Sequence, residues 1–426
     1  MKTIKGKKDL FTFPSLSGEI CVAFIWATVL YTSVIQFKFP VSNGMLILGL
    51  FMLGFFILAQ TGQGFKLKHL LTKESKWMLS FMIYMLPVGL VVAPVSSSHI
   101  TQWITSFEYL FVMVVVSSLI MKLGTESFHL LLLVIGVLLM FFLIQSPVKF
   151  YGTNRLSLSD DLNPNGLGMC FAESIWAILY FQQKKKVSII ISISFVALFC
   201  YGIILTGSRK SLIATGIIVT IWYFFCFLSK KDKESNKWRP LIIFGSFVLI
   251  GVFGLLFFKL YAGSDMASRI EDLENETVSG SRVEMYTFGW NLFCEHPLFG
   301  LGFQGFKHFY GHYSHATLVE VPVSGGVLGS ILYFAAYYMS IKKIFYLFRL
   351  CKNNRNFACE FGEIKMLLGM WAAMLFYCTC IIHPYQFDSY FVFGIIFGQS
   401  AYIEKKVLAM QTEQRITERR KCKWIK

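Results

Sequence analysis

The chain has 426 residues, of which 55% are hydrophobic, 17% aromatic and only 15% charged. A mean hydropathy of +0.58 excludes an ordinary water-soluble domain and is typical of a protein that crosses a membrane many times. The net charge of +16 would suit a nucleic-acid-binding protein, but 31 of the 40 Lys and Arg residues fall in segments that we place on the inner side of the membrane. The basic excess therefore indicates topology, and we expect no nucleic-acid partner.

Apolar stretches recur along the whole chain, and about 20 apolar residues suffice for one helix to cross a bilayer. We predict one all-α integral membrane domain over residues 1–426, with about 12 transmembrane helices. Residues 1–18 are basic and lack a small-residue cleavage site, which predicts a cytoplasmic tail instead of a removable signal. The predicted spans are 19–36, 43–60, 78–95, 104–121, 129–147, 166–183, 188–205, 211–228, 241–259, 324–341, 365–382 and 389–403.

The distribution of Lys and Arg predicts a cytoplasmic (inner) membrane protein with both termini in the cytoplasm. A large extracytoplasmic loop, residues 260–323, then lies between the ninth and tenth helices. Nine basic residues remain on the outer side, most of them in this loop and in the loops 148–165 and 206–210. The positive-inside rule disfavours basic residues on the outer side, so a local interaction should account for their presence there. Only one of the ten cysteines, Cys294, lies in an outer loop, and we expect no structural disulfide.

Two of the basic outer loops end where a helix is predicted to begin. Asn163 precedes Pro164, which reads as an N-cap followed by proline at the first helical position. Ser208, or alternatively Thr206, would cap a helix that begins at Arg209.

A third helix start is predicted inside the large loop. Ser281–Glu284 has the pattern of a capping box, and the helix would continue to about Phe293. Its apolar side chains would share one face, as in a helix that lies at the membrane surface. These side chains are Val283, Tyr286, Trp290 and Phe293.

Arg209 and Arg282 would both lie in the first turn of a helix, where the helix dipole disfavours a cation by roughly 0.3–1 kcal/mol. A bound anion would reverse this effect, because helix N-termini and arginine side chains both favour phosphate. The pattern therefore indicates an outer anion site, most economically for a diphosphate. The alternative is that both side chains contact lipid headgroups.

Three histidines, His308, His312 and His315, follow an i, i+4, i+7 spacing that could place them on one helical face. A zinc site is one interpretation, but Gly311 interrupts the segment and a structural role for His308 and His312 is the default. His315 differs, because it precedes an apolar run at the outer mouth and could take a proton from a hydroxyl. The acidic run 271–276 could hold Mg²⁺, although a solvated loop is the commoner explanation.

Four segments resemble motifs of the O-antigen ligase and capsular polysaccharide polymerase superfamily of bacterial membrane enzymes. RLSLSDDLNPNGLG at 155–168 is similar to an Arg…Asn-Pro-Asn element, and TGSRKSLI at 206–213 to a Ser-Arg-x-x-Leu helix start. The segment 279–306 resembles the arginine-bearing start of the large loop with its HP-x-x-G-x-G motif, and 314–329 its histidine-bearing end. Ala316 departs from the family, which often has Asn after the histidine.

The resemblance implies a glycosyltransferase that uses a polyprenyl-diphosphate-linked oligosaccharide (undecaprenyl diphosphate in bacteria) and needs no metal or other cofactor. Arg209 and Arg282 would grip the diphosphate, and His315 would act as the base at the outer face of the membrane. The remaining substrate-binding candidates are Arg155, Asn163, Asn165, Lys210 and Glu320.

The compact large loop and the absence of extra domains favour a polymerase of capsular, exopolysaccharide or O-antigen repeat units. The alternative within the family is a ligase that transfers the glycan to a different acceptor. From other classes, a transporter or flippase of lipid-linked sugars and a non-catalytic scaffold stay open, although transporters tend to carry ionisable residues near the midplane of the membrane. Other polysaccharide-assembly proteins are possible partners.

Overall fold

A computed structural model describes residues 15–34, 71–149, 155–159, 163–224, 277–352, 354 and 357–424. The predicted spans 43–60 and 241–259 lie outside these residues, as does the acidic run 271–276 with the first part of the predicted large loop.

Each of the other ten predicted spans coincides with a helix, so the prediction of a helical protein is confirmed for them. In the described part of the chain, α3, α4, α5 and α13 are long and apolar enough to cross a membrane, and α7 is a shorter apolar helix. These helices support an integral membrane protein, while the number of spans stays a prediction. The ten helices are α1 (Ser15–Ser33), α3 (Lys73–Val92), α4 (Ser96–Leu123), α5 (Glu126–Gln145), α6 (Pro164–Gln183), α7 (Ile189–Leu205), α8 (Arg209–Tyr223), α13 (Thr317–Lys352), α14 (Ala358–Tyr377) and α15 (Phe387–Trp424).

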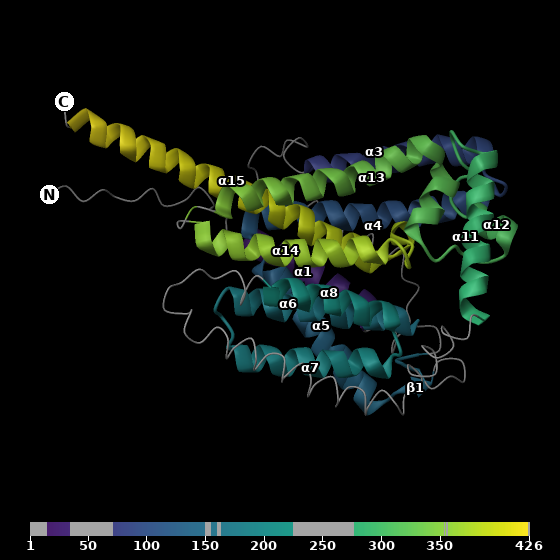
Figure 1. Cartoon of the computed structure of the whole chain (residues 1–426), viewed down its shortest axis with the longest axis horizontal. Helices are drawn as coiled ribbons and strands as arrows, with labels where there is room; N and C mark the ends of the chain where they lie inside the picture. The colour runs from purple at the N-terminus through teal and green to yellow at the C-terminus, as the bar shows by residue number, and fades with distance from the viewer. Residues whose placement is uncertain are drawn as a thin grey trace.

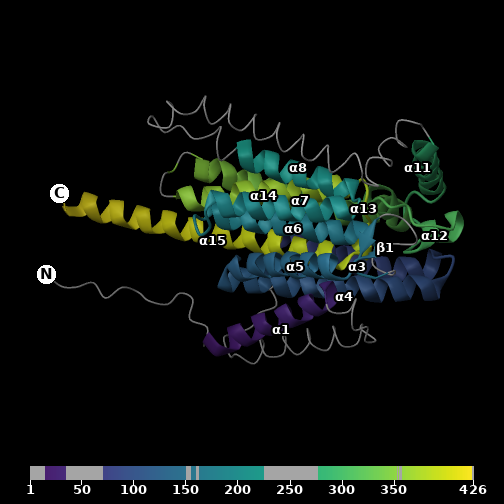
Figure 2. The same ribbon diagram turned by 90° about the horizontal axis from the view of Figure 1, so that it is seen from below.

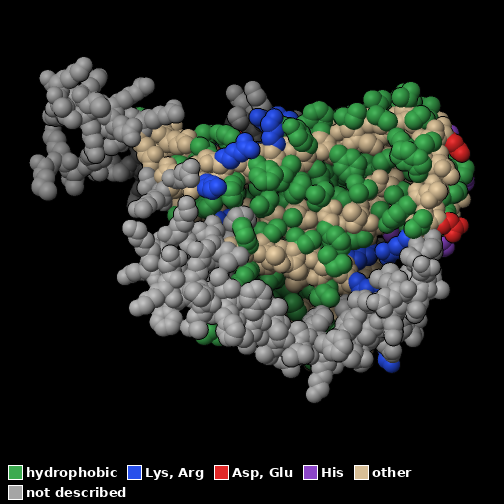
Figure 3. Space-filling model, viewed as in Figure 1, with side chains coloured by type: hydrophobic (Ala, Val, Ile, Leu, Met, Phe, Trp, Pro, Cys, Tyr) green, Lys and Arg blue, Asp and Glu red, His purple; other side chains and the backbone are tan. Residues whose placement is uncertain are grey.

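The long helices run side by side along one axis, and their flank is covered by hydrophobic side chains (Figures 1 and 3). At one end, α11 (Thr277–Glu295) runs across the helix ends, next to α12 (Gly305–Tyr310) (Figure 1). We call this the loop end; the 3-10 helix η7 (His383–Tyr385) packs there too. α1 begins and α15 finishes at the opposite end (Figure 2). This arrangement agrees with termini on one side of a membrane, and the identity of that side stays a prediction.

Helix α6 is the centre of the packing, because every residue from Leu167 to Phe181 is buried. A helix that is apolar on all sides is expected inside a bundle. Two of its polar side chains bond to neighbouring helices: the Trp176 indole donates to the Met366 carbonyl of α14 at 3.0 Å, and Ser174 donates to the Leu132 carbonyl of α5 at 2.8 Å.

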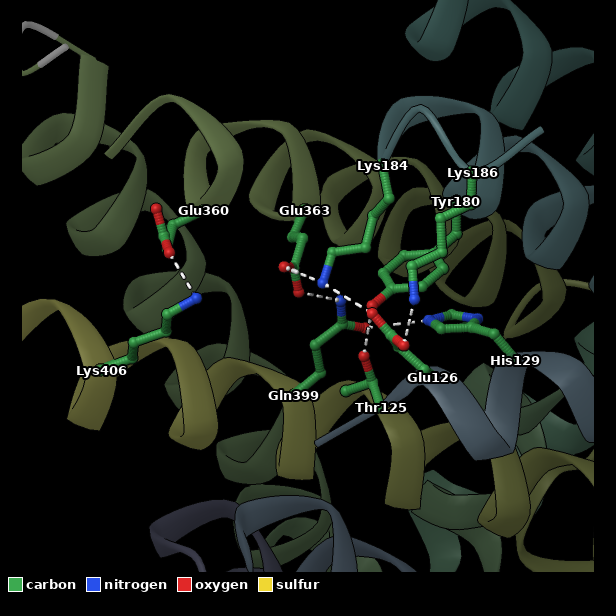
Figure 4. A network of polar contacts seen from close by, with 10 residues as sticks. All are labelled: Thr125, Glu126, His129, Tyr180, Lys184, Lys186, Glu360, Glu363, Gln399 and Lys406. Atoms are coloured by element: carbon green, nitrogen blue, oxygen red, sulfur yellow. Dashed lines mark hydrogen bonds and ion pairs between the residues drawn. The ribbon is translucent and has the colours of Figure 1, made fainter. Parts of the chain in front are cut away.

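A buried polar network ties four helices together at the end opposite the loop end, where α6 ends and α5 and α14 begin. Figure 4 shows its side chains. The Lys184 ammonium lies 2.8 Å from Glu363 and 3.3 Å from Glu126. Gln399 of α15 donates to Glu363 at 3.3 Å, and its amide oxygen lies 3.3 Å from Nε2 of His129. The network joins α5, α6, α14 and α15, and it fixes the helices whose far ends reach the loop end.

Helix α13 begins at Thr317, earlier than predicted, and is interrupted at Gly326 (φ 61°, ψ −161°). The backbone groups released by the break bond to the loop that follows α11. Leu301 and Gly302 donate to Val323 and Ser324 at 2.8 Å, and Val327 donates to Pro297 at 2.8 Å. Irregular backbone within a membrane protein is tolerated where other protein groups satisfy it in this way. The break thus attaches the large loop to a long helix.

Gly300 makes this close approach possible. It adopts φ +69°, and a Cβ atom built on it would lie 2.6 Å from the Gly326 nitrogen. A side chain at this position would collide with the backbone of α13, so only glycine fits at residue 300.

Three details of the sequence-based prediction are corrected. The predicted loop 148–165 contains an antiparallel pair of short strands, β1 (Val148–Lys149) and β2 (Leu156–Ser157), so the fold is not purely α. The capping-box prediction is wrong, because α11 begins at Thr277 and Arg282 lies beyond its first turn. The four apolar side chains predicted to share one face of α11 do not do so. Val283 and Trp290 are exposed, whereas Tyr286 and Phe293 pack against the buried cluster that contains Met285 and Leu292.

Candidate active site

The starts of α6 and α8 follow the sequence-based prediction. Asn163 is the N-cap of α6, its side-chain oxygen accepting the Asn165 N–H at 2.9 Å. Helix α8 begins at Arg209, with Ser208 at the N-cap position. The Ser208 hydroxyl makes no capping bond and instead lies 2.8 Å from the Ser211 hydroxyl.

Arg155 joins these two helix starts. Its Nε donates to the Thr206 carbonyl at 3.0 Å, and a terminal nitrogen donates to the Asn165 side chain at 3.0 Å. The guanidinium side chain is buried and passes 3.2 Å from the Cβ position of Gly207. In this structure Arg155 and Asn165 hold in place the turn between α7 and α8, which leads directly into Arg209 and Lys210.

Lys210 connects α8 to the turn that follows α14. Its ammonium donates to the Cys380 carbonyl, and Tyr286 of α11 donates to the neighbouring Thr379 carbonyl at 3.1 Å. Two segments of distant sequence therefore meet on one short turn. Lys and Arg side chains gather at the loop end where α8 approaches α11 (Figure 3).

Arg282 of α11 is exposed and lies close to the same turn. Burial raises the pKa of the Cys380 thiol, and the positive charges of Lys210 and Arg282 oppose that rise. Both cations therefore lie near this thiol.

His315 lies in the field of these two cations. Partial burial lowers its pKa from the ordinary value of 6.5, and the charges of Lys210, Arg282 and His312 lower it further. The residue itself is exposed and adopts a left-handed backbone conformation, φ 55°. A neutral imidazole beside two permanent cations can accept a proton next to a bound anion.

The predicted row of three histidines is not formed. Helix α12 ends at Tyr310, and Gly311 follows with φ +87°, so His312 and His315 do not continue the helical face of His308. Among the described residues, no group of three His, Cys, Asp or Glu side chains could hold a metal ion. The three histidines therefore do not share one helical face, which the zinc interpretation required.

The structure brings Lys210, Arg282 and His315 together, and Arg209 is adjacent to Lys210 in the first turn of α8. Glu320, predicted to bind substrate, is buried, and both of its carboxylate oxygens accept hydrogen bonds from protein groups. One accepts the Ser314 hydroxyl at 2.6 Å, and the other accepts the Tyr385 hydroxyl at 3.0 Å.

Sequence reasoning missed the contribution of residues 379–385, because it assigned 379–382 to the predicted span 365–382 and only 383–385 to the short outer loop that follows it. The carbonyls of residues 379–385 receive Lys210 and Tyr286, and Ile381 accepts both the amide and the hydroxyl of Thr317, at 2.8 and 2.6 Å. Backbone acceptors leave no mark on composition. The only available signal was that this loop lies on the same predicted side as the basic residues.

Comparison with known families finds one match to this part of the chain. Residues 193–334 match the family model described as O-antigen ligase. The matched range includes α8, α11, α12 and the first half of α13, and so contains Lys210, Arg282 and His315. No curated protein matches the chain.

Proposed function

We propose that the site transfers a lipid-linked glycan to a sugar hydroxyl, because residues 193–334 match the family model described as O-antigen ligase. The donor would be an oligosaccharide on a polyprenyl diphosphate, and the reaction would take place at the outer face of the cytoplasmic membrane. The observation that carries the proposal is the position of His315 in the combined field of Lys210 and Arg282.

The cations supply what a diphosphate leaving group requires. Negative charge grows on the bridging phosphate oxygen as the glycosidic bond breaks, and fixed positive charge next to that oxygen stabilises the transition state. An arginine can also form two parallel hydrogen bonds with a phosphate group. Arg209 would contribute at the adjacent helix start, where backbone N–H groups also favour an anion.

His315 would take the proton. The acceptor hydroxyl oxygen forms a bond to the anomeric carbon of the donor, while the bond from that carbon to the diphosphate oxygen breaks. The hydroxyl proton moves to the imidazole, and polyprenyl diphosphate leaves. The leaving group is already activated, so the proposed reaction needs no metal ion.

The acceptor decides between two activities. We favour a polymerase, in which the acceptor is another lipid-linked repeat unit of a capsular polysaccharide, exopolysaccharide or O-antigen. Transfer to a different acceptor would make the protein a ligase. Glycan chain length in a deletion strain separates them: single repeat units on the acceptor indicate lost polymerisation, whereas long chains left on the lipid carrier indicate lost ligation.

Substitution of Arg282 by Lys tests the proposed site directly. We expect the transfer rate to fall by about 100-fold, because lysine keeps the charge but cannot form the paired hydrogen bonds. Arg349→Lys, near the opposite end of α13, is the matched control and should keep the wild-type rate. The assay measures glycan transfer by purified protein in liposomes with lipid-linked oligosaccharide.

Full activity of Arg282→Lys at normal membrane expression would contradict the proposal. The same liposomes test the transporter alternative, since movement of lipid-linked sugar across the bilayer without new glycosidic bonds would favour a flippase.

A further inference from the structure

The backbone at His315 is held in a conformation that histidine rarely adopts. Its φ of 55° lies in the left-handed region, which is sterically unfavourable for a residue with a Cβ atom. Such a conformation persists only where the surrounding structure determines it, and it is commonly found at functional sites. The contacts on either side of His315 show what determines it here.

Hydrogen bonds hold the chain on both sides of His315. On the C-terminal side, the amide and the hydroxyl of Thr317 donate to the Ile381 carbonyl, and the Thr317 hydroxyl accepts the His383 N–H at 2.9 Å. On the N-terminal side, the Ser314 hydroxyl lies 2.6 Å from Oε2 of Glu320, and the Ser314 amide donates to the same oxygen at 3.3 Å. Ser314, Thr317 and Glu320 are all buried, whereas His315 between them is exposed.

Glu320 also links the loop that contains His315 to η7 and to the residue before α12. Its Oε1 accepts the Tyr385 hydroxyl of η7 at 3.0 Å, and Tyr385 in turn accepts the Gln304 N–H at 3.3 Å. Gln304 is also left-handed, with φ 68°, and precedes α12. The Glu320 side chain, which is 1% exposed, therefore connects Ser314, the residue before His315, to η7 and, through Tyr385, to Gln304.

We propose that Glu320 is a positioning residue: through Ser314 and Tyr385 it holds the His315 ring toward Lys210 and Arg282 without touching substrate. The inference rests on the proposed function of His315, and it replaces the substrate-binding role that the family resemblance implies for Glu320.

Four variants separate positioning from substrate binding. Glu320→Ala removes both acceptors, whereas Glu320→Gln keeps one amide oxygen for Ser314 and offers a donor to Tyr385. Ser314→Ala removes the hydroxyl that donates to Glu320, together with its bonds to the Ala316 backbone, with little change in volume. Glu284→Gln, on the exposed face of α11, is the matched control.

The first measurement is the steady-state kinetics of transfer. We expect Glu320→Ala to lower kcat by about 100-fold with little change in the KM for the donor, because a displaced base slows the reaction without weakening binding. Glu320→Gln should recover most of the loss, and Ser314→Ala should fall between the two. A raised KM with unchanged kcat, or a Glu320→Gln variant as slow as Glu320→Ala, would show that the carboxylate contacts substrate.

The second measurement does not depend on catalysis. Diethyl pyrocarbonate acylates neutral imidazoles, and mass spectrometry resolves the rate at each of the eight histidines. We expect faster modification of His315 in Glu320→Ala and Ser314→Ala, and the wild-type rate in Glu284→Gln. An unchanged His315 rate in both loop variants overturns the inference. If the rate changes while His315→Ala keeps full transfer activity, positioning stands and the proposed catalytic function fails.

Discussion

At the scale of residues, the charge around His315 determines the pH range in which it can act as a base. Partial burial lowers its pKa from 6.5, and the charges of Lys210, Arg282 and His312 lower it further. Positive neighbours disfavour the imidazolium, so the neutral form persists to lower pH than for a free histidine.

The acidic limb of kcat/KM should therefore lie below pH 6.5 in the wild-type protein. In Lys210→Ala one of the opposing charges is gone, the pKa of His315 rises, and the limb should move up by about 0.5–1 pH unit. The midpoint of the pH profile is the readout, because the variant also loses donor affinity.

Lys307→Ala is the control for this shift, since the Lys307 ammonium lies 4.6 Å from the centre of the Tyr313 ring and is not among the charges that act on His315. An unshifted midpoint in Lys210→Ala would mean that the titrating base is another group.

At the scale of elements, the break in α13 and the loop 297–302 form one unit that attaches the large loop to the helices. Sequence reasoning located the helix that follows the loop, because hydropathy reports apolar length, and it located the starts of α6 and α8, because capping is local. It missed the break, because the bonds that satisfy it come from residues more than 20 positions away. It missed the hydrogen bond between Glu320 and Tyr385 for the same reason, because the two residues are 65 positions apart in sequence.

Gly300→Ala tests this unit. Its Cβ would lie 2.6 Å from the Gly326 nitrogen, so the paired backbone must separate, and we expect a loss of about 1–3 kcal/mol. The measurement is the Tm of purified protein in detergent.

Gly311→Ala provides the matched control, because Gly311 also has positive φ but no atom lies within 4 Å of its Cβ position. Equal Tm values for the two variants would show that conformational strain, and not the close approach, accounts for the effect.

At the scale of the whole molecule, the buried network of Figure 4 holds the helices at one end while the candidate site lies at the other. Lys184 and Glu363 are 17% and 4% exposed, whereas Lys186 and Glu126 are 50% and 45% exposed. Removal of Lys184 leaves a buried carboxylate without its cation, which typically costs about 3–5 kcal/mol. An exposed ion pair contributes about 0–1 kcal/mol.

Lys184→Met should therefore lower the Tm far more than Lys186→Met, although both substitutions remove one positive charge from the same turn. A double variant, Lys184→Met with Glu363→Gln, should recover part of the loss because it removes the unpaired charge. Similar Tm values for the two single variants would mean that the network does not stabilise the packing of these helices.

The central claim is that Lys210, Arg282 and His315 converge on the diphosphate of a lipid-linked glycan. An experimental structure with polyprenyl diphosphate bound measures this most directly. The account predicts phosphate oxygens within about 3 Å of the Arg282 guanidinium and the Lys210 ammonium, with the His315 ring beside the terminal phosphate, which carries the sugar in the donor. A diphosphate bound elsewhere, with these three side chains away from it, would contradict the account.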